Sequence, residues 1–213
     1  MPGWNTLSTI SRCENVSLDW LTDGDGSPFN VVDCDDIEHA QIIRYSADEE
    51  PCDALYVVTT YGNFCVVTTT QTQLQLPKKP PVDYTEIGIS GKGVGPLTMA
   101  AVAYTIGRVP VRLVDVQEDV FERLVTGYMG NPELIGWKNT EGILSDATGI
   151  ASKKDFDELM LARGLMNSES GESEYAYGAR EDRASYNSEE LNLIHAFRQM
   201  PENKRKALIE LLT

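Results

Sequence analysis

Residues 54–71 have the sequence ALYVVTTYGNFCVVTTTQ and carry the clearest β-strand pattern of the chain. Two runs rich in Val, Thr, Tyr and Phe, residues 54–61 and 64–71, flank the pair Gly62-Asn63. β-branched and aromatic residues favour strands, and a Gly-Asn pair between two such runs is typical of a two-residue hairpin turn of the primed type. This stretch therefore predicts an antiparallel β-hairpin in the middle of the chain.

The residues after this hairpin predict a strand, a glycine-rich loop, a helix and a second strand. The strands are expected at residues 84–89 and 109–116, and the loop is GKGVG at residues 91–95. Pro96 suits the first turn of the helix, which apolar residues at helical spacing continue through Ile106. The mixture of a hairpin with helices predicts an α+β fold: a central mixed α/β domain with a β-hairpin.

The rest of the central region gives weaker patterns. Residues 37–45 fit either a strand or a short helix, and both remain open. A helix is expected at residues 118–129, with Gly130 as its stop. Ser152 and Asp155 resemble a capping box and predict a further helix that Gly164 ends.

Both ends of the chain predict short helices. Asn5 or Thr6 is expected to cap the first one, and Ser17 a second at residues 18–22, which Gly24 ends. A Ser-, Glu- and Gly-rich stretch without periodicity predicts a flexible linker, and the leucine-rich end predicts a C-terminal helical hairpin. The expected divisions are therefore residues 1–28, 29–166, 167–187 and 188–213.

The composition sets limits on function. The 213 residues are 41% hydrophobic and 24% charged, which suits a protein with a buried core. No apolar run is long enough to span a membrane, and no secretory signal is present, so a cytoplasmic location is expected.

The net charge is −15, and it is unevenly spread. The first 60 residues carry −10, whereas residues 61–114 carry +3. Such a balance opposes non-specific binding to nucleic acid by the chain as a whole. It fits a solvated acidic face or a surface that meets a basic partner protein.

Cysteine and histidine usage predicts neither a metal site nor a catalytic centre. There is no Cys-x-x-Cys pair and no histidine at metal-ligand spacing from a cysteine. Two histidines leave little room for a Ser-His or Cys-His hydrolase. We therefore expect no enzyme activity, no metal and no cofactor, with reduced thiols. The residues concerned are Cys13, Cys34, Cys52, Cys65, His39 and His195.

The N-terminal segment resembles a known family. PGWNTL at residues 2–7, VSLDWL at 16–21 and GDGSP at 24–28 resemble the end of the helix-turn-helix domain of phage CI-type repressors and related XRE-like regulators. The tail at residues 189–212 is similar to the C-terminal helical hairpin of such regulators. The resemblance implies that residues 2–28 are the C-terminal part of a helix-turn-helix, because the two helices that cross and enter the major groove would precede Pro2.

The resemblance also implies roles for particular residues. The start of the fourth helix approaches DNA phosphates in this family, which makes Trp4, Asn5 and Thr6 candidates for backbone contacts. In the alternative interpretation Trp4 packs a small core and Asn5 caps a helix. Oligomerisation would use the apolar side of the C-terminal hairpin, at Leu191, Ile194, Leu208 and Leu211.

The function that the resemblance implies is transcriptional regulation of the phage-repressor type. Operator DNA would be read by a helix-turn-helix supplied upstream or by a partner, and the chain would form a homo-oligomer. The chain contains no Ala-Gly or Cys-Gly dipeptide, so the self-cleavage of LexA-like domains is not expected. Release from DNA would then need an antirepressor protein or a small ligand.

Two other hypotheses remain open. One is a nucleotide-binding sensor or enzyme, in which Gly91, Gly93 and Gly95 approach a pyrophosphate and Asp115 holds a ribose. Against it, the glycine spacing is GxGxG rather than GxGxxG, and Pro96 removes a backbone donor. The other is an interaction module that captures a full-length regulator into inactive mixed oligomers.

The tryptophans other than Trp4 are expected to have a structural role. Trp20 lies between the apolar anchors of the second helix, and Trp137 opens a loop-rich stretch. A large aromatic ring in a globular domain is more often a packing anchor than a platform for a ligand. We therefore expect both side chains to pack into the core.

Overall fold

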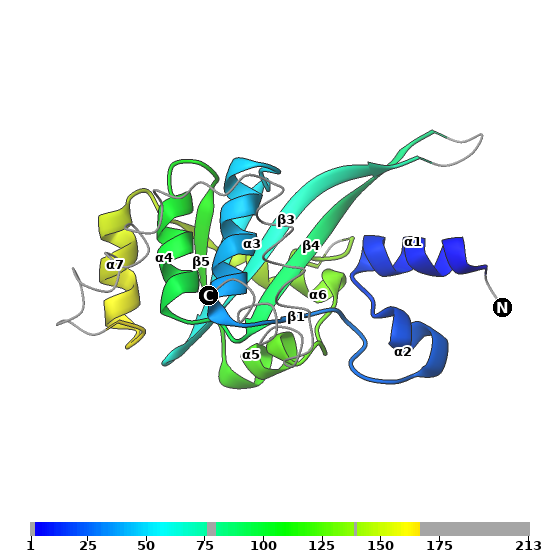
Figure 1. The fold of residues 1–213 in the computed structure, drawn as a ribbon, viewed down its shortest axis with the longest axis horizontal. Coiled ribbons are helices and arrows are strands. Elements are labelled where there is room, and N and C mark those ends of the chain that lie inside the picture. The colour runs from blue at the N-terminus through cyan, green and yellow to red at the C-terminus, as the bar shows by residue number, and fades with distance from the viewer. Residues whose placement is uncertain (1–2, 76–79, 139, 167–213) are drawn as a thin grey trace, which may run out of the picture. The chain divides into compact units, whose positions relative to one another are not determined.

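The computed structural model describes residues 3–75, 80–138 and 140–166 (Figure 1). These residues fall within one compact unit that runs to Tyr175. The division expected after residue 28 therefore lies inside this unit. The expected linker at 167–187 and the hairpin at 188–213, with Leu191, Ile194, Leu208 and Leu211, lie outside the described residues.

In the described part of the chain, six strands form one mixed sheet in the order β1-β4-β3-β2-β5-β6. β2, β3 and β4 are antiparallel neighbours, β5 runs parallel to β2, and β1 runs parallel to β4. Helices and a sheet together confirm the α+β class. The strands are β1 (Val32–Asp33), β2 (Ala54–Thr60), β3 (Asn63–Leu74), β4 (Val82–Lys92), β5 (Val111–Asp115) and β6 (Thr148–Gly149).

The predicted hairpin is confirmed, but its turn lies one residue earlier than expected. Thr60 pairs with Asn63, so the two turn residues are Tyr61 and Gly62. Only Gly62 in this turn has a positive φ, +75°. A primed turn needs a positive φ at its first central residue, so the primed assignment is wrong and the φ signs are those of a type II turn.

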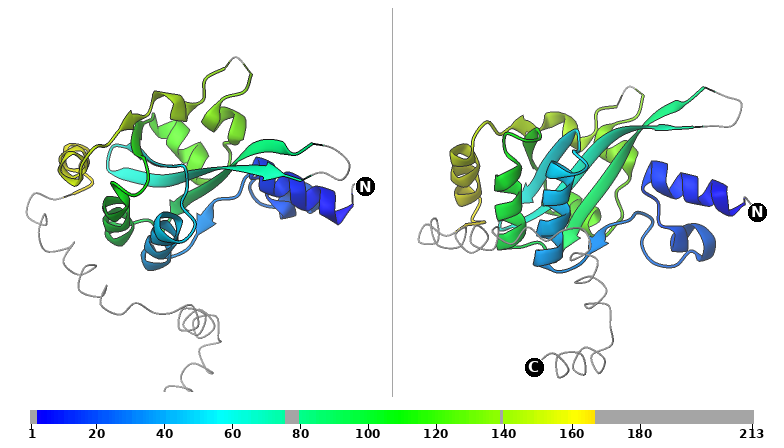
Figure 2. Two further views of the ribbon diagram at one scale, coloured as in Figure 1. Left: turned by 90° about the horizontal axis from the view of Figure 1, so that it is seen from above. Right: turned by 45° about the horizontal axis from the view of Figure 1, so that its top comes forward.

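Helices cover both faces of the sheet (Figures 1 and 2). One face packs against α3 (Asp36–Asp48), α4 (Pro96–Thr105) and α7 (Lys153–Ala162), with Ile43, Val102 and Phe156 among the buried side chains. The other face packs against α5 (Glu118–Val125), α6 (Asn131–Ile135) and a short 3₁₀ helix, Ile143–Asp146. Successive side chains of β2 point to opposite faces of the sheet, so Val57 packs in the first core and Val58 in the second.

The start of α4 is capped from another helix. Pro96 has no N–H and the N-cap Gly95 has no side chain, so α4 contains no cap of its own. The carboxylate of Asp36, the first residue of α3, accepts hydrogen bonds from the backbone N–H of Leu97 at 2.9 Å and of Thr98 at 2.8 Å. It also accepts the Thr98 hydroxyl at 2.6 Å. Three hydrogen bonds to this carboxylate thus join the starts of the two helices.

The open choice for residues 37–45 is settled as a helix, α3. The Asp35 side chain caps it by accepting the N–H of Glu38 at 2.9 Å. His39 is fully buried, and its Nε2 lies 2.5 Å from the backbone oxygen of Lys92 at the end of β4. The helix is therefore fixed to both α4 and the sheet.

The N-terminal helices are α1 (Trp4–Glu14) and α2 (Leu18–Asp23). Ser17 caps α2, and Gly24 ends it with a φ of +78°, as predicted. The expected cap of α1 is wrong: its N-cap is Gly3, with no side-chain hydrogen bond, and Asn5 lies inside the helix. The carbonyl of Asn5 instead accepts the Thr9 hydroxyl at 2.8 Å. Neither helix, both fully described, contains a buried residue.

Two helix boundaries differ from the expectation. α5 ends at Val125 because Gly127, with a φ of +75°, turns the chain three residues before the expected stop. Gly130 is instead the N-cap of α6, which the sequence did not predict. The capping of α7 by Ser152 is confirmed, since its hydroxyl accepts the N–H of Asp155 at 3.1 Å. No helix in the described part of the chain combines the length and hydropathy needed to cross a membrane.

Replacing Asp36 tests the contact between the two helices. Asp36→Ala leaves the first amides of α4 without their acceptor and is expected to lower the free energy of unfolding by about 1–3 kcal/mol. Asp36→Asn keeps one oxygen acceptor and should fall between Asp36→Ala and the parent. Urea unfolding followed by circular dichroism measures the change. Asp33→Ala removes an exposed carboxylate from nearby β1 and serves as the control. An equal loss of stability in both alanine variants would show that Asp36 does not cap α4.

Candidate functional site

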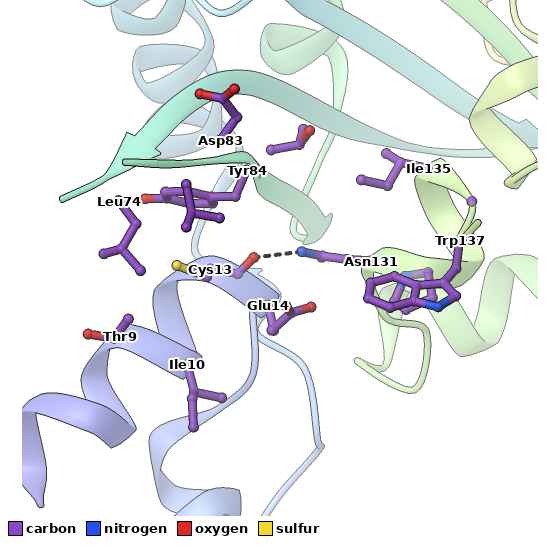
Figure 3. A pocket seen from close by; sticks show the side chains of 14 residues that line it. Thr9, Ile10, Cys13, Glu14, Leu74, Asp83, Tyr84, Asn131, Ile135 and Trp137 are labelled. Carbon is purple, nitrogen blue, oxygen red and sulfur yellow. Dashed lines mark hydrogen bonds between the residues drawn. The ribbon is translucent and has the colours of Figure 1, made fainter. Parts of the chain in front are cut away.

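A groove lies between α1, the outer ends of β3 and β4, and the α6 region (Figure 3). Its volume is about 520 Å³. β3 and β4 extend past the helical layers on the side of α1, and this extension forms one wall (Figure 1). Most of the lining is apolar or aromatic, from Ile10, Leu74, Val82, Tyr84, Ile135 and Trp137.

Contacts from α1 and from the chain around Phe29 join the N-terminal helices to the rest of the described unit. The side-chain amide Nδ2 of Asn131 donates to the backbone oxygen of Cys13 at 3.0 Å, across the groove in Figure 3. The guanidinium of Arg12 lies 5.9 Å from the ring centroid of Tyr84. The chain then leaves α2 through Phe29, whose N–H donates to the oxygen of Gly127 at 3.0 Å. The groove therefore forms where α1 meets the central sheet and the α6 region.

The polar groups of the groove disfavour anionic occupants. Burial raises the pKa of both the Cys13 thiol and the Tyr84 hydroxyl above their ordinary values, so both are protonated at pH 7. Glu14 adds a carboxylate to the lining, whereas the carboxylate of Asp83 points away from α1 in Figure 3 and accepts the side-chain amide of Gln73 at 2.8 Å. Asn131 is only 6% exposed, and its Oδ1 is buried without a hydrogen-bond partner among the described residues.

The residues expected to approach DNA lie together at the start of α1. Trp4, Asn5 and Thr6 are all exposed, with Trp4 65% exposed. The alternative interpretation, with Trp4 in a small core and Asn5 as a cap, is not what the structure shows. Trp20 and Trp137, expected to be packing anchors, are 42% and 58% exposed, so that expectation is wrong as well.

The glycine-rich segment is shaped by packing. Gly91 belongs to β4, and the loop consists of the residues from Gly93 to Gly95. A Cβ on Gly93 would lie 1.9 Å from the backbone oxygen of Cys34, and one on Gly95 would lie 2.8 Å from Asp36 Oδ2. The chain entering α3 therefore requires these glycines, and Asp36 occupies the helix N-terminus where a phosphate would bind.

Asp115 serves a separate contact at the end of β5. Its Oδ1 accepts the Nε of Arg163 at 2.7 Å and the hydroxyl of Thr59 at 2.6 Å. The hydrogen bond from Arg163 is the main reason that the pKa of Asp115 lies below its ordinary value. Two strands, β3 and β2, separate β4 from β5 in the sheet. The glycine loop and Asp115 therefore do not form one site, and the geometry gives the nucleotide hypothesis no support.

The sequence did not predict the groove. Its walls come from three parts of the chain, residues 9–14, residue 74 with 82–85, and residues 131–137, and no spacing along the chain connects them. The exposure of Trp137 would have been a signal, but a single sequence does not report exposure. In the described ranges, no group of three His, Cys, Asp or Glu side chains is placed to hold a metal ion.

No protein-family model matches this chain, and neither the curated proteins nor the solved structures include a match.

The role of the glycine loop is testable with a matched pair of substitutions. Gly93→Ala adds a methyl group against the Cys34 carbonyl at a φ of +79° and is expected to destabilise the protein by at least about 3 kcal/mol. Gly24→Ala has the same backbone strain, φ +78°, but no atom within 4 Å, and should cost about 1 kcal/mol. Urea midpoints give both values. Equal costs would show that residue 93 has open space, as a vacant phosphate loop would.

Proposed function

We propose that this chain is a transcriptional regulator of the phage-repressor type, in which α1 and α2 are the part of a helix-turn-helix domain nearest the central domain. The observation that carries the proposal is the state of these two helices. Together they bury no residue, yet they expose Trp4 and Trp20. Two short helices that bury none of their residues need further helices to cover these exposed rings.

The covering helices would be those that read the operator. They would be supplied upstream or by a partner chain, in agreement with the resemblance of residues 2–28. The caps agree with this view, because Ser17 caps the start of α2 and Gly24 its end, within the stretch that carries the resemblance. The acidic charge of the described central region suits a part of the regulator that does not itself lie along DNA.

The start of α1 suits a phosphate contact. Trp4, Asn5 and Thr6 are exposed there, and the first turn contains no acidic residue. The positive end of the helix dipole is therefore not neutralised locally, unlike that of α4, where Asp36 is bound. In this proposal the N–H groups and polar side chains of the first turn position the domain on the DNA backbone without reading bases.

The central domain would act without catalysis in the cytoplasm. It would carry the oligomerisation surfaces, together with Leu191, Ile194, Leu208 and Leu211 of the expected C-terminal hairpin. Self-cleavage is not part of the proposal, so an antirepressor protein or a small ligand would release the regulator from its operator.

Crosslinking in the native cell tests the proposal directly. The epitope-tagged chain is crosslinked to DNA, recovered and the bound DNA is sequenced. We expect strong enrichment at a few discrete sites. The combined variant Trp4→Ala, Asn5→Ala and Thr6→Ala loses backbone contacts and should reduce this enrichment about tenfold.

The control is Tyr45→Ala, which removes another exposed aromatic side chain, on α3 and far from α1 in sequence. It should leave the enrichment unchanged. Enrichment no greater than that of an untagged strain would contradict the proposed function. An equal reduction in the Tyr45 control would contradict the role of the first turn of α1.

A further inference from the structure

The groove has the dimensions of a ligand site. At about 520 Å³ it lies within the range of small-molecule pockets, about 300–1,000 Å³. Its lining combines apolar walls with few polar groups, which is the usual composition of such pockets. Figure 3 shows Trp137 and Ile135 at one end, Tyr84 and Leu74 at the other, and Asn131 between them.

The apolar walls favour a flat aromatic body. Trp137 is 58% exposed although it lines a concave surface, so a ligand that covers the indole removes apolar area from water. The Tyr84 ring supplies a second aromatic surface at the opposite end. Aromatic pairs gain more than their buried area alone provides.

Asn131 calls for one hydrogen-bond donor. Its Nδ2 is used by the carbonyl of Cys13, whereas its Oδ1 is buried without a partner in the described part of the chain. A buried amide oxygen normally accepts a hydrogen bond. An N–H or O–H of a ligand would satisfy it, with a small movement of the groove wall, of which α1 is one side.

Charge disfavours anionic occupants. Glu14 lines the groove, and none of the described residues that line it is Lys or Arg. The carboxylate of Asp83 points away from α1 in Figure 3 and accepts the side-chain amide of Gln73 at 2.8 Å. A carboxylate, sulfonate or phosphate in the groove would therefore meet the acidic side chain of Glu14 without a cation to balance its charge.

We propose that the groove between α1, β3–β4 and α6 binds a neutral aromatic amphiphile, a flat apolar compound with a single hydrogen-bond donor. The site is distinct from the DNA contact in the proposed function and stands without it. An occupant would touch both α1 and the central sheet.

The test uses two fluorescent probes that share one skeleton. N-phenyl-1-naphthylamine is neutral, aromatic and has one N–H, whereas 1-anilinonaphthalene-8-sulfonate adds a negative charge. Titrated into the full chain without DNA, the neutral probe is expected to bind at one site, at least about tenfold more tightly than the sulfonate. The N-methylated form of the neutral probe lacks the donor and should bind about fivefold to tenfold more weakly.

Two tryptophan variants locate the site. Trp137→Ala should weaken binding of the neutral probe about tenfold. Trp20→Ala removes another exposed indole, which lies on α2 outside the groove, and should leave binding of the neutral probe unchanged. Both side chains are exposed, so both variants should fold. Equal binding of the sulfonate, or of the N-methylated probe, would overturn the proposed ligand class. Loss of binding in Trp20→Ala alone, or in neither variant, would overturn the location.

Discussion

The carboxylate of Asp36 at the start of α4 is the interaction on which the arrangement of this domain depends. It accepts hydrogen bonds from the Leu97 and Thr98 amides and from the Thr98 hydroxyl. It thereby joins α3 and α4, which follow the carboxyl ends of the neighbouring strands β1 and β4. A charged acceptor at a helix N-terminus satisfies amides that have no partner within the helix and also meets the positive end of the dipole. Asp36 is the first residue of α3. Because its carboxylate caps α4, the position of α3 and the direction of α4 are fixed together.

This contact explains a sequence pattern that looks like something else. GKGVG followed by a helix and an acidic residue has the outline of a nucleotide-binding loop. In the structure, Gly93 and Gly95 admit the backbone of residues 34–36, and the anion at the helix is part of the protein. The same physical requirements, close backbone approach and a negative charge at a helix N-terminus, are thus met within the chain. A glycine-rich motif indicates that another group comes close to the backbone. It does not show whether that group is a ligand phosphate or another part of the protein.

The parts of the fold that local chemistry determines were predictable. The hairpin follows from β-branched residues around a turn, and α2 and α7 follow from their serine caps. Short elements were missed, because β1 and α6 are stabilised by what they pack against and carry little local pattern. The predicted turn differs from the observed one by one residue, because Gly62 is the second turn residue and not the first.

The candidate site was less predictable for a physical reason. The contact between Cys13 and Asn131 joins residues far apart in the chain, and no periodicity connects them. Tryptophan content suggests packing, whereas Trp4, Trp20 and Trp137 are all substantially exposed. We propose that these exposed rings are contact sites. Trp4 and Trp20 would be covered by further helices, and Trp137 by a ligand in the groove. The firmly packed part, built around the Asp36 contact, would then be the scaffold that holds these surfaces.

Hydrogen exchange at the start of α4 tests this account most directly. The first amides of a helix normally exchange quickly, because they have no partner within the helix. We expect the Leu97 and Thr98 amides, followed by nuclear magnetic resonance, to exchange as slowly as those in the middle of α4. Exchange as fast as at an exposed helix start, such as α1, would show that the carboxylate of Asp36 does not hold the two helices together.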